Sequence, residues 1–223
     1  MKKFWHNHKA FTLVELVVAI AITGIIASVV SVLVGTVIRV QKNSELSAQL
    51  YNVSQRLHTA VTSQLSTAES VELYKNTSYS ATVGAKEQFM YLYTNAANAK
   101  NGHILVATQS SHSPGDELLM RAESYDGATV EAFYVTLDTV VEKATPDAEE
   151  ETTQYRVLHV FTRISKGGKT YEHTSSVRLF NMMLTGGQVV LPSGVNQAMA
   201  VANPTNSSYQ FVGVRYTVAG QNE

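Results

Sequence analysis

The sequence predicts an α+β protein in which one long N-terminal helix precedes an antiparallel β-sheet domain. Residues 11–66 contain no proline, and their apolar positions follow helical spacing. From residue 67 onward the pattern changes to short runs of period two, bounded by Gly, Asn, Ser and Pro. The chain also has no cysteine, so the stability of the β-rich part has to come from a packed core without disulfides.

The composition excludes several classes of protein. A length of 223 residues fits one domain, or at most two. The net charge is -1, so no overall basic field indicates a nucleic-acid-binding protein. Without cysteine there can be no thiolate metal site and no cysteine nucleophile.

The first half of the predicted helix is apolar on all sides. Residues 16–38 carry no formal charge and would form a helix of about 35 Å, which can cross a hydrocarbon core of about 30 Å. Lys2, Lys3 and Lys9 precede this run and favour a cytoplasmic N-terminus, although Arg39 follows it. A secretory signal peptide is the alternative, but its apolar region is about 7–15 residues long and ends at a small-x-small site, which is missing here.

The second half of the predicted helix carries a single apolar stripe. Its positions recur at steps of three and four, with Ser, Gln, Asn and His between them. We therefore expect one continuous helix of about 80 Å, whose second half packs on the β-sheet. The stripe consists of Leu46, Leu50, Val53, Leu57, Ala60 or Val61, and Leu65.

The β-rich part contains seven candidate strands with loops between them. The strands are expected at residues 88–93, 103–107, 117–122, 131–137, 154–165, 169–180 and 209–218. The loops are expected at residues 95–102, 110–116, 143–153 and 186–208.

The expected strands at residues 154–165 and 169–180 are predicted to form a hairpin. Gly167 and Gly168 separate them, and a two-residue hairpin turn needs positive φ at both positions. In this register His159 and His173 project to opposite faces. The expected pairs are Arg163 with Glu172, Leu158 with Val177, Ile164 with Tyr171, and Tyr155 with Phe180.

One carboxylate stands near the start of the apolar run. Glu15 would cost about 2.5–3.5 kcal/mol in hydrocarbon, so its presence there needs a reason. The surrounding stretch, "KAFTLVELVVAIAITGIIA", resembles the class III signal of type IV prepilins and type II secretion pseudopilins. The match runs through Ala10, Phe11, Thr12, Leu13, Val14 and Glu15.

The resemblance implies a pilin-like fold and a processing reaction. A prepilin peptidase would cut between Ala10 and Phe11 and methylate the new amino group of Phe11. Residues 1–10 would be the leader, 11–66 the long helix (11–38 the transmembrane and filament-core part) and 67–223 the globular head. Glu15 would pair with the ammonium of Phe11 on a neighbouring subunit. Such a buried ion pair would fix the position of one subunit relative to the next. The chain departs from the family at Ala10, which is usually glycine, and it lacks the helix-bending proline of many major pilins.

The resemblance also implies the partners and the location. The partners are the prepilin peptidase, other pilin or pseudopilin subunits, an assembly platform protein, indirectly an assembly ATPase, and membrane lipid before assembly. The protein would first be a single-pass membrane protein with a cytoplasmic N-terminus and an extracellular head, and then part of an extracellular filament. The missing proline and the chain length favour a minor pilin. The alternative is a membrane-anchored extracellular binding module that does not polymerise.

No catalytic residues, cofactor site or metal site are predicted. The sequence contains no G-x-S-x-G, P-loop or H-E-x-x-H motif, so we expect no enzyme. The seven histidines are interpreted as scattered surface residues, and the acidic run at residues 146–151 as a solvated hairpin tip and not a calcium loop. The head tyrosines are assigned to sheet and core positions in preference to an exposed group that binds sugars or a partner.

Overall fold

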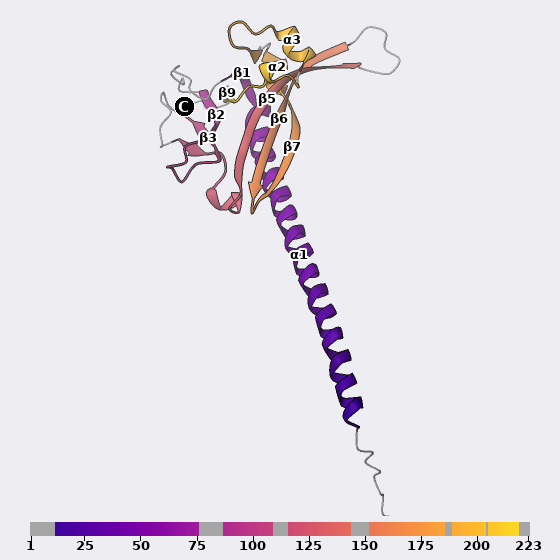
Figure 1. Cartoon of the computed structure of the whole chain (residues 1–223). Coiled ribbons are helices and arrows are strands. Elements are labelled where there is room, and N and C mark those ends of the chain that lie inside the picture. Colours follow the sequence, from indigo (N-terminus) through magenta and orange to yellow (C-terminus); the bar gives the residue numbers. More distant parts are fainter. Residues whose placement is uncertain are drawn as a thin grey trace, which may run out of the picture. The chain divides into compact units, whose positions relative to one another are not determined.

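The computed structural model divides the chain into two compact units, Met1–Glu45 and Leu46–Glu223. Helix α1 begins in the first unit and ends in the second (Figure 1). Each unit is described by itself below. The described residues are 12–75, 87–108, 116–143, 152–185, 189–203 and 205–218.

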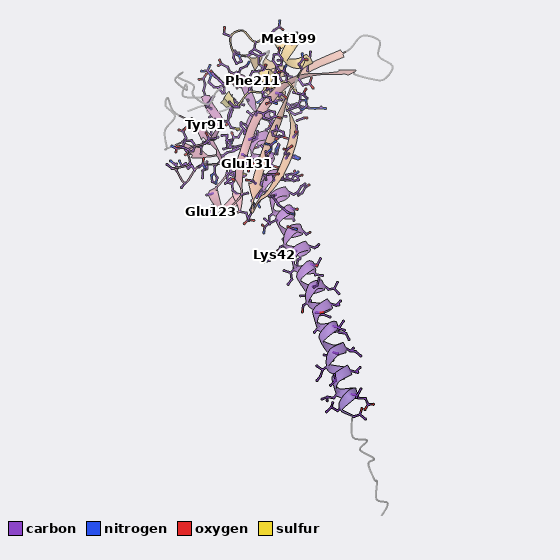
Figure 2. The ribbon with its side chains drawn as sticks, in the orientation of Figure 1. Lys42, Tyr91, Glu123, Glu131, Met199 and Phe211 are labelled. Carbon is purple, nitrogen blue, oxygen red and sulfur yellow. The ribbon has the colours of Figure 1, made fainter. Side chains whose placement is uncertain are left out.

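Helix α1 (Leu13–Ser66) is continuous over 54 residues, as the absence of proline predicted. In the first unit its large aliphatic side chains, from Leu13 to Val40, are between 48% and 79% exposed. They project from the helix on all sides (Figure 2). Because the hydrophobic effect opposes such exposure in water, this part of α1 requires an apolar environment.

The first sheet of the head has six strands in the order β4-β3-β2-β9-β1-β8. Its pairs are antiparallel except that β1 and β8 run parallel. The strands are β1 (Ala68–Tyr74), β2 (Glu87–Tyr93), β3 (His103–Ala107), β4 (Glu117–Leu118), β8 (Val189–Val190) and β9 (Gly213–Val218).

The second sheet is antiparallel and has the order β5 (Thr129–Lys143), β6 (Thr152–Lys166) and β7 (Lys169–Arg178). The turn between β6 and β7 has φ of 57° at Gly167 and 77° at Gly168, which confirms the predicted two-residue hairpin. Its register is the expected one for three of the four pairs: Arg163 with Glu172, Leu158 with Val177, and Ile164 with Tyr171.

The fourth predicted pair, Tyr155 with Phe180, is wrong. The ladder between β6 and β7 ends where Val157 lies opposite Arg178, and Tyr155 pairs with Val140 on the other neighbouring strand, β5. Phe180 begins the short helix α2 (Phe180–Thr185). Leu179, just before it, is 1% exposed, so the chain leaves the strand at a residue that is buried in the core.

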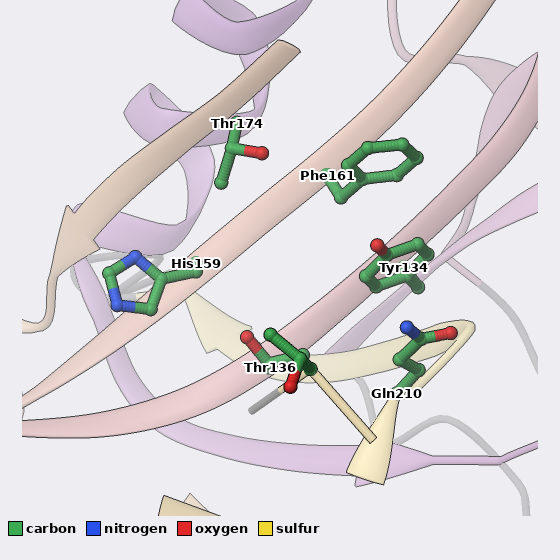
Figure 3. Close-up of a pocket in the computed structure, with 7 residues that line it drawn as sticks. Tyr134, Thr136, His159, Phe161, Thr174 and Gln210 are labelled. Carbon is green, nitrogen blue, oxygen red and sulfur yellow. The ribbon is translucent and has the colours of Figure 1, made fainter. Parts of the chain in front are cut away.

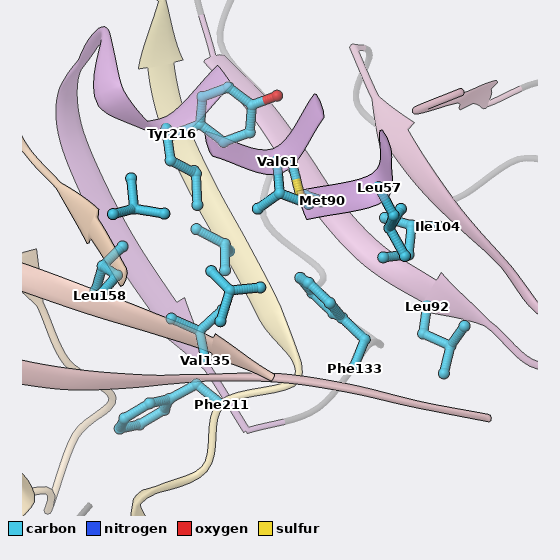
Figure 4. Close-up of a cluster of buried hydrophobic side chains, with 14 of the residues drawn as sticks. Leu57, Val61, Met90, Leu92, Ile104, Phe133, Val135, Leu158, Phe211 and Tyr216 are labelled. Carbon is cyan, nitrogen blue, oxygen red and sulfur yellow. The ribbon is translucent and has the colours of Figure 1, made fainter. Parts of the chain in front are cut away.

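The core joins the second half of α1 to both sheets. Leu50, Val53, Leu57, Val61 and Leu65 are each at most 1% exposed, which confirms that the apolar stripe faces the sheets. Burial of each such side chain stabilises the fold by about 1.5–3 kcal/mol. Figure 4 shows residues of this cluster from α1 and from strands of both sheets.

Several other predicted boundaries need correction. Strand β1 was not predicted, because Glu69 and Glu72 interrupt a run in which only Val71 and Leu73 are large aliphatic residues. The segment predicted as one loop at 186–208 contains β8, helix α3 (Gln197–Ala202) and the 3-10 helix η2 (Ser207–Tyr209). The Asn196 side chain accepts hydrogen bonds from the first amides of α3 and so starts this helix.

Three predicted strand lengths also differ from the structure. The strand predicted at 117–122 ends at Leu118, and residues 122–125 form the 3-10 helix η1 (Ala122–Tyr125). The strand predicted at 209–218 begins only at Gly213, whereas β5 extends well beyond the predicted 131–137. The predicted loop at 95–102 is confirmed. Residues 110–115 and 144–151, which include the acidic run, lie outside the described residues.

Candidate functional site

The first turn of α1 is built around Thr12 and Glu15. The Thr12 amide and the Thr12 hydroxyl both donate to Oε2 of Glu15, each at 3.0 Å. In return, the Glu15 amide donates to the Thr12 hydroxyl oxygen at 3.3 Å. This reciprocal pattern between residues three apart is a capping box, which satisfies amides that have no acceptor within the helix.

The capping box gives Glu15 a second structural role beside the one implied by the resemblance. Both hydrogen bonds to the carboxylate end on Oε2, whereas Oε1 accepts no hydrogen bond from the described residues. A further donor can therefore approach Glu15 while its own helix start remains intact. Ala10 and Phe11, the predicted cleavage and methylation residues, lie outside the described residues.

The hydroxyl groups in the apolar half of α1 are paired within the helix. Thr23 donates to the Ala19 carbonyl at 2.7 Å, and Ser31 donates to the Ala27 carbonyl at 2.8 Å. Ser28 and Thr36 do the same with carbonyls three and four residues back. These polar groups therefore need no water, which removes the main cost of placing them in hydrocarbon.

This part of α1 has the length and composition of a membrane span. Among the described residues, α1 is the one helix long and apolar enough to cross a bilayer, and it lies near the N-terminus. One of its faces carries small residues at helical spacing, Ala19, Thr23, Gly24 and Ala27, together with Leu16 and Ile20. Small residues let two apolar helices approach closely.

The head contains a buried polar cluster where α1 meets β6 and β7. His58 is 3% exposed; its Nε2 lies 2.7 Å from the Thr162 hydroxyl and its Nδ1 lies 2.5 Å from the Ser175 hydroxyl. Burial, together with a smaller electrostatic effect of the nearby His173, lowers the pKa of the His58 imidazole to about 4. The two imidazole rings meet edge to face with centroids 4.3 Å apart.

His58 corrects the interpretation of all histidines as surface residues. It comes directly after Leu57, a residue of the apolar stripe, and so lies on the buried side of α1. Ser54, one turn earlier, is also fully buried, and its hydroxyl has no hydrogen-bond partner among the described residues. Sequence spacing could have indicated both positions, because residues 54, 58 and 61 lie on one helical face.

The prediction that His159 and His173 project to opposite faces of the sheet is confirmed. His173 faces α1 beside His58, whereas His159 projects from the opposite face of the sheet, where it bonds to Asp138 at 3.0 Å and to Ser176 at 2.9 Å. Within the described ranges, no three His, Asp or Glu side chains come together as metal ligands do.

One comparison with known proteins identifies the N-terminal segment. Residues 5–31 match the family model of the prokaryotic N-terminal methylation motif. This match covers the residues predicted for cleavage and methylation, the capping box and about two thirds of the apolar run. No curated protein and no solved structure matches the chain.

Proposed function

We propose that this chain, a pilin-like protein that carries a class III signal, is a structural subunit of a type IV pilus-like filament, either a minor pilin or a pseudopilin. The observation that carries the proposal is the methylation motif at the start of a helix whose first half is apolar and exposed on all sides. A motif of this family marks structural precursors and not enzymes. The pilin-like layout of a long apolar helix followed by a sheet-rich head supports the same assignment.

Processing of the leader is the first step of the proposed mechanism. A prepilin peptidase would cleave after Ala10, and Phe11 would become the methylated N-terminus. Residues 1–10 would be lost, 11–66 would form the long helix and 67–223 the head. The new ammonium of Phe11 would then lie only four residues before Glu15 in the sequence, at the N-terminal end of the apolar run.

Glu15 would position the subunit during assembly. Its carboxylate is costly in hydrocarbon when unpaired, by about 2.5–3.5 kcal/mol. The capping box offsets part of this cost through Oε2 and leaves Oε1 for the ammonium of Phe11 on a subunit already in the filament. Because only a correctly staggered neighbour supplies that ammonium, the pair favours one axial position over others.

The proposal includes a location and a set of partners. Before assembly, residues 11–38 would hold the protein in the cell membrane, with a cytoplasmic N-terminus and an extracellular head. The aliphatic side chains of this segment would then exchange lipid for the helices of other subunits. An assembly platform protein and, indirectly, an assembly ATPase would drive this transfer.

A second candidate is an anchored extracellular binding module that never polymerises. The same apolar helix would suffice as its anchor. Such a module has no use for cleavage after Ala10, and it needs Glu15 only for the capping box.

The state of the N-terminus separates the two candidates. We would isolate the full chain from membranes of cells that contain an active prepilin peptidase, and measure its intact mass and its N-terminal peptide. The filament proposal expects a chain that begins at Phe11 and carries one added methyl group. A chain that still begins at Met1 under these conditions would contradict it and favour the anchored module.

A further inference from the structure

The outer face of the second sheet contains a pocket of about 290 Å³ that the proposed filament function does not use. Residues from β5, β6 and β7 form its floor, and the chain just before β9 forms one wall (Figure 3). This face lies opposite the one that packs on α1, where Leu158 and Val160 are buried. All of the pocket lies within the head.

Two aromatic rings lie on the pocket floor. Tyr134 on β5 and Phe161 on β6 are direct cross-strand partners, and their rings stack with centroids 4.5 Å apart and planes at 17°. Both side chains are half-buried, although they lie on the sheet face away from the core. The stack leaves one face of each ring uncovered by the other, which offers a flat apolar surface to a ligand.

The wall of the pocket is fixed by backbone pairing. The Val135 amide donates to the Phe211 carbonyl at 2.8 Å, and the Phe211 amide donates back to the Val135 carbonyl at 2.9 Å. This bridge holds Gln210 beside the floor of the pocket. It also explains why Thr136, on the outer face, is only 5% exposed.

The polar groups around the rings are hydroxyls, an amide and an imidazole, supplied by Thr136, Thr174, Thr205, Gln210 and His159. The imidazole is held in place by its bonds to Asp138 and Ser176. The lining residues of the described pocket include no Lys, Arg, Asp or Glu. Hydroxyls and amides can both donate and accept hydrogen bonds, so they match a ligand that is itself rich in hydroxyl groups.

We propose that this pocket binds one ring of a neutral carbohydrate. The apolar C–H face of a sugar ring would pack on the uncovered face of Phe161, because the negative face of an aromatic ring attracts polarised C–H bonds, and Tyr134 would support Phe161 from its other side. Its hydroxyls would bond to Gln210 and Thr174 at the edge. The pocket volume suits a single ring, and its combination of an apolar floor with a few fixed polar groups is the usual composition of small-ligand sites.

The lining argues against two other classes of ligand. A nucleotide or an anionic polysaccharide needs cationic partners, which the lining lacks. An added β-strand would have to pair with a free strand edge, whereas the floor is the face of a sheet. An uncharged hydroxylated ring is the class that the described groups complement.

Saturation-transfer NMR on the full chain tests the inference. The chain would be placed in phosphatidylcholine nanodiscs, because maltoside and glucoside detergents carry competing sugars. The probes are the methyl glycosides of glucose, galactose and N-acetylglucosamine, with sialic acid as a charged comparison. We expect transfer to at least one methyl glycoside and none to sialic acid.

Matched variants identify the site. Phe161→Leu keeps an apolar side chain on β6 but removes the ring, and we expect it to weaken binding at least about tenfold. Phe180→Leu is the control, because Phe180 is 56% exposed and does not line the pocket. If Phe161→Leu fails to fold, Thr174→Val at the exposed rim takes its place, with a smaller loss expected.

Three results would overturn the inference. The first is the absence of transfer to all three methyl glycosides, and the second is equal transfer in wild type and in Phe161→Leu. The third is preferential binding of sialic acid, since the pocket would then recognise an anion. None of these results bears on filament assembly, because the pocket lies in the head and the assembly proposal rests on α1.

Discussion

Nε2 of His58 lies 2.7 Å from the hydroxyl of Thr162, and this contact joins α1 to β6 inside the head. His58 also reaches Ser175 on β7, so one imidazole connects the helix to two strands of the second sheet. A buried imidazole paired with two hydroxyls is stable as the neutral form, whereas its charged form would lose solvation without gaining a carboxylate.

The head should therefore lose stability in mild acid. The pKa of His58 is about 4 in the folded head, against an ordinary histidine pKa of 6.5 in the unfolded chain. Between these values the unfolded chain binds more protons, so the contribution of His58 is fully present above pH 6.5 and is lost as the pH falls toward 4. The loss is at most about 3 kcal/mol.

Chemical denaturation of the full chain in nanodiscs, followed by tyrosine fluorescence from pH 7.5 to 4.5, measures this loss. His58→Gln should flatten the profile in this range relative to wild type. Equal slopes in wild type and His58→Gln would contradict the assigned role of His58.

Ser54→Ala is expected to stabilise the head. The Ser54 hydroxyl is fully buried and has no partner in the part of the chain that the structure describes, and an unsatisfied buried hydroxyl costs about 1–3 kcal/mol. Alanine also has the higher helix propensity. Ser63→Ala changes the same residue type on the exposed side of α1, where the hydroxyl bonds to the Ala60 carbonyl, and so controls for propensity. A free energy of unfolding that falls in Ser54→Ala would show that this hydroxyl has a partner.

The β6–β7 turn should tolerate asparagine at Gly168 better than alanine. Gly168 has φ of 77°, and a Cβ there would meet no atom within 4 Å, so the penalty comes from the backbone alone. We expect Gly168→Ala to lower the free energy of unfolding by about 1–2 kcal/mol. Asparagine visits this region more readily, so Gly168→Asn should cost less. Equal costs measured by denaturation would exclude the backbone explanation.

The Thr12 hydroxyl should govern the first turn of α1. Thr12→Val removes both hydrogen bonds of that hydroxyl and is expected to cost about 1 kcal/mol of local stability. Amide hydrogen exchange at Glu15 should then be about fivefold faster in nanodiscs, whereas Thr12→Ser should keep the wild-type rate. Unchanged protection in Thr12→Val would mean that the capping box does not hold this turn.

Sequence periodicity predicted the elements whose pattern is uniform. The helix, its buried stripe and the β6–β7 register follow from spacing alone, because Gly167 and Gly168 fix the turn and the pleat then fixes each pair. The register failed at Phe180, where the burial of Leu179 and the start of α2 end the strand. Neither feature is visible in the local pattern.

The features that the sequence did not reveal depend on contacts between distant segments. His58 gains its partners from residues more than one hundred positions away. The carbohydrate pocket needs Gln210 beside β5, and that placement depends on the bridge between Val135 and Phe211. The capping box of Thr12 and Glu15 is local, and its Thr-x-x-Glu spacing could have been recognised.

The most direct test of the filament proposal is the recovery of the chain in sheared surface filaments, compared between wild type and Glu15→Gln. Glutamine at this position retains an acceptor for the capping box but has no charge, so it isolates the pairing with a neighbouring ammonium. The proposal predicts wild-type chain in the filament fraction and Glu15→Gln chain left in the membrane fraction, with both cleaved before Phe11. Recovery of Glu15→Gln in filaments at the wild-type level would contradict the charge pairing, and absence of processed wild-type chain from the filaments would contradict the proposed function.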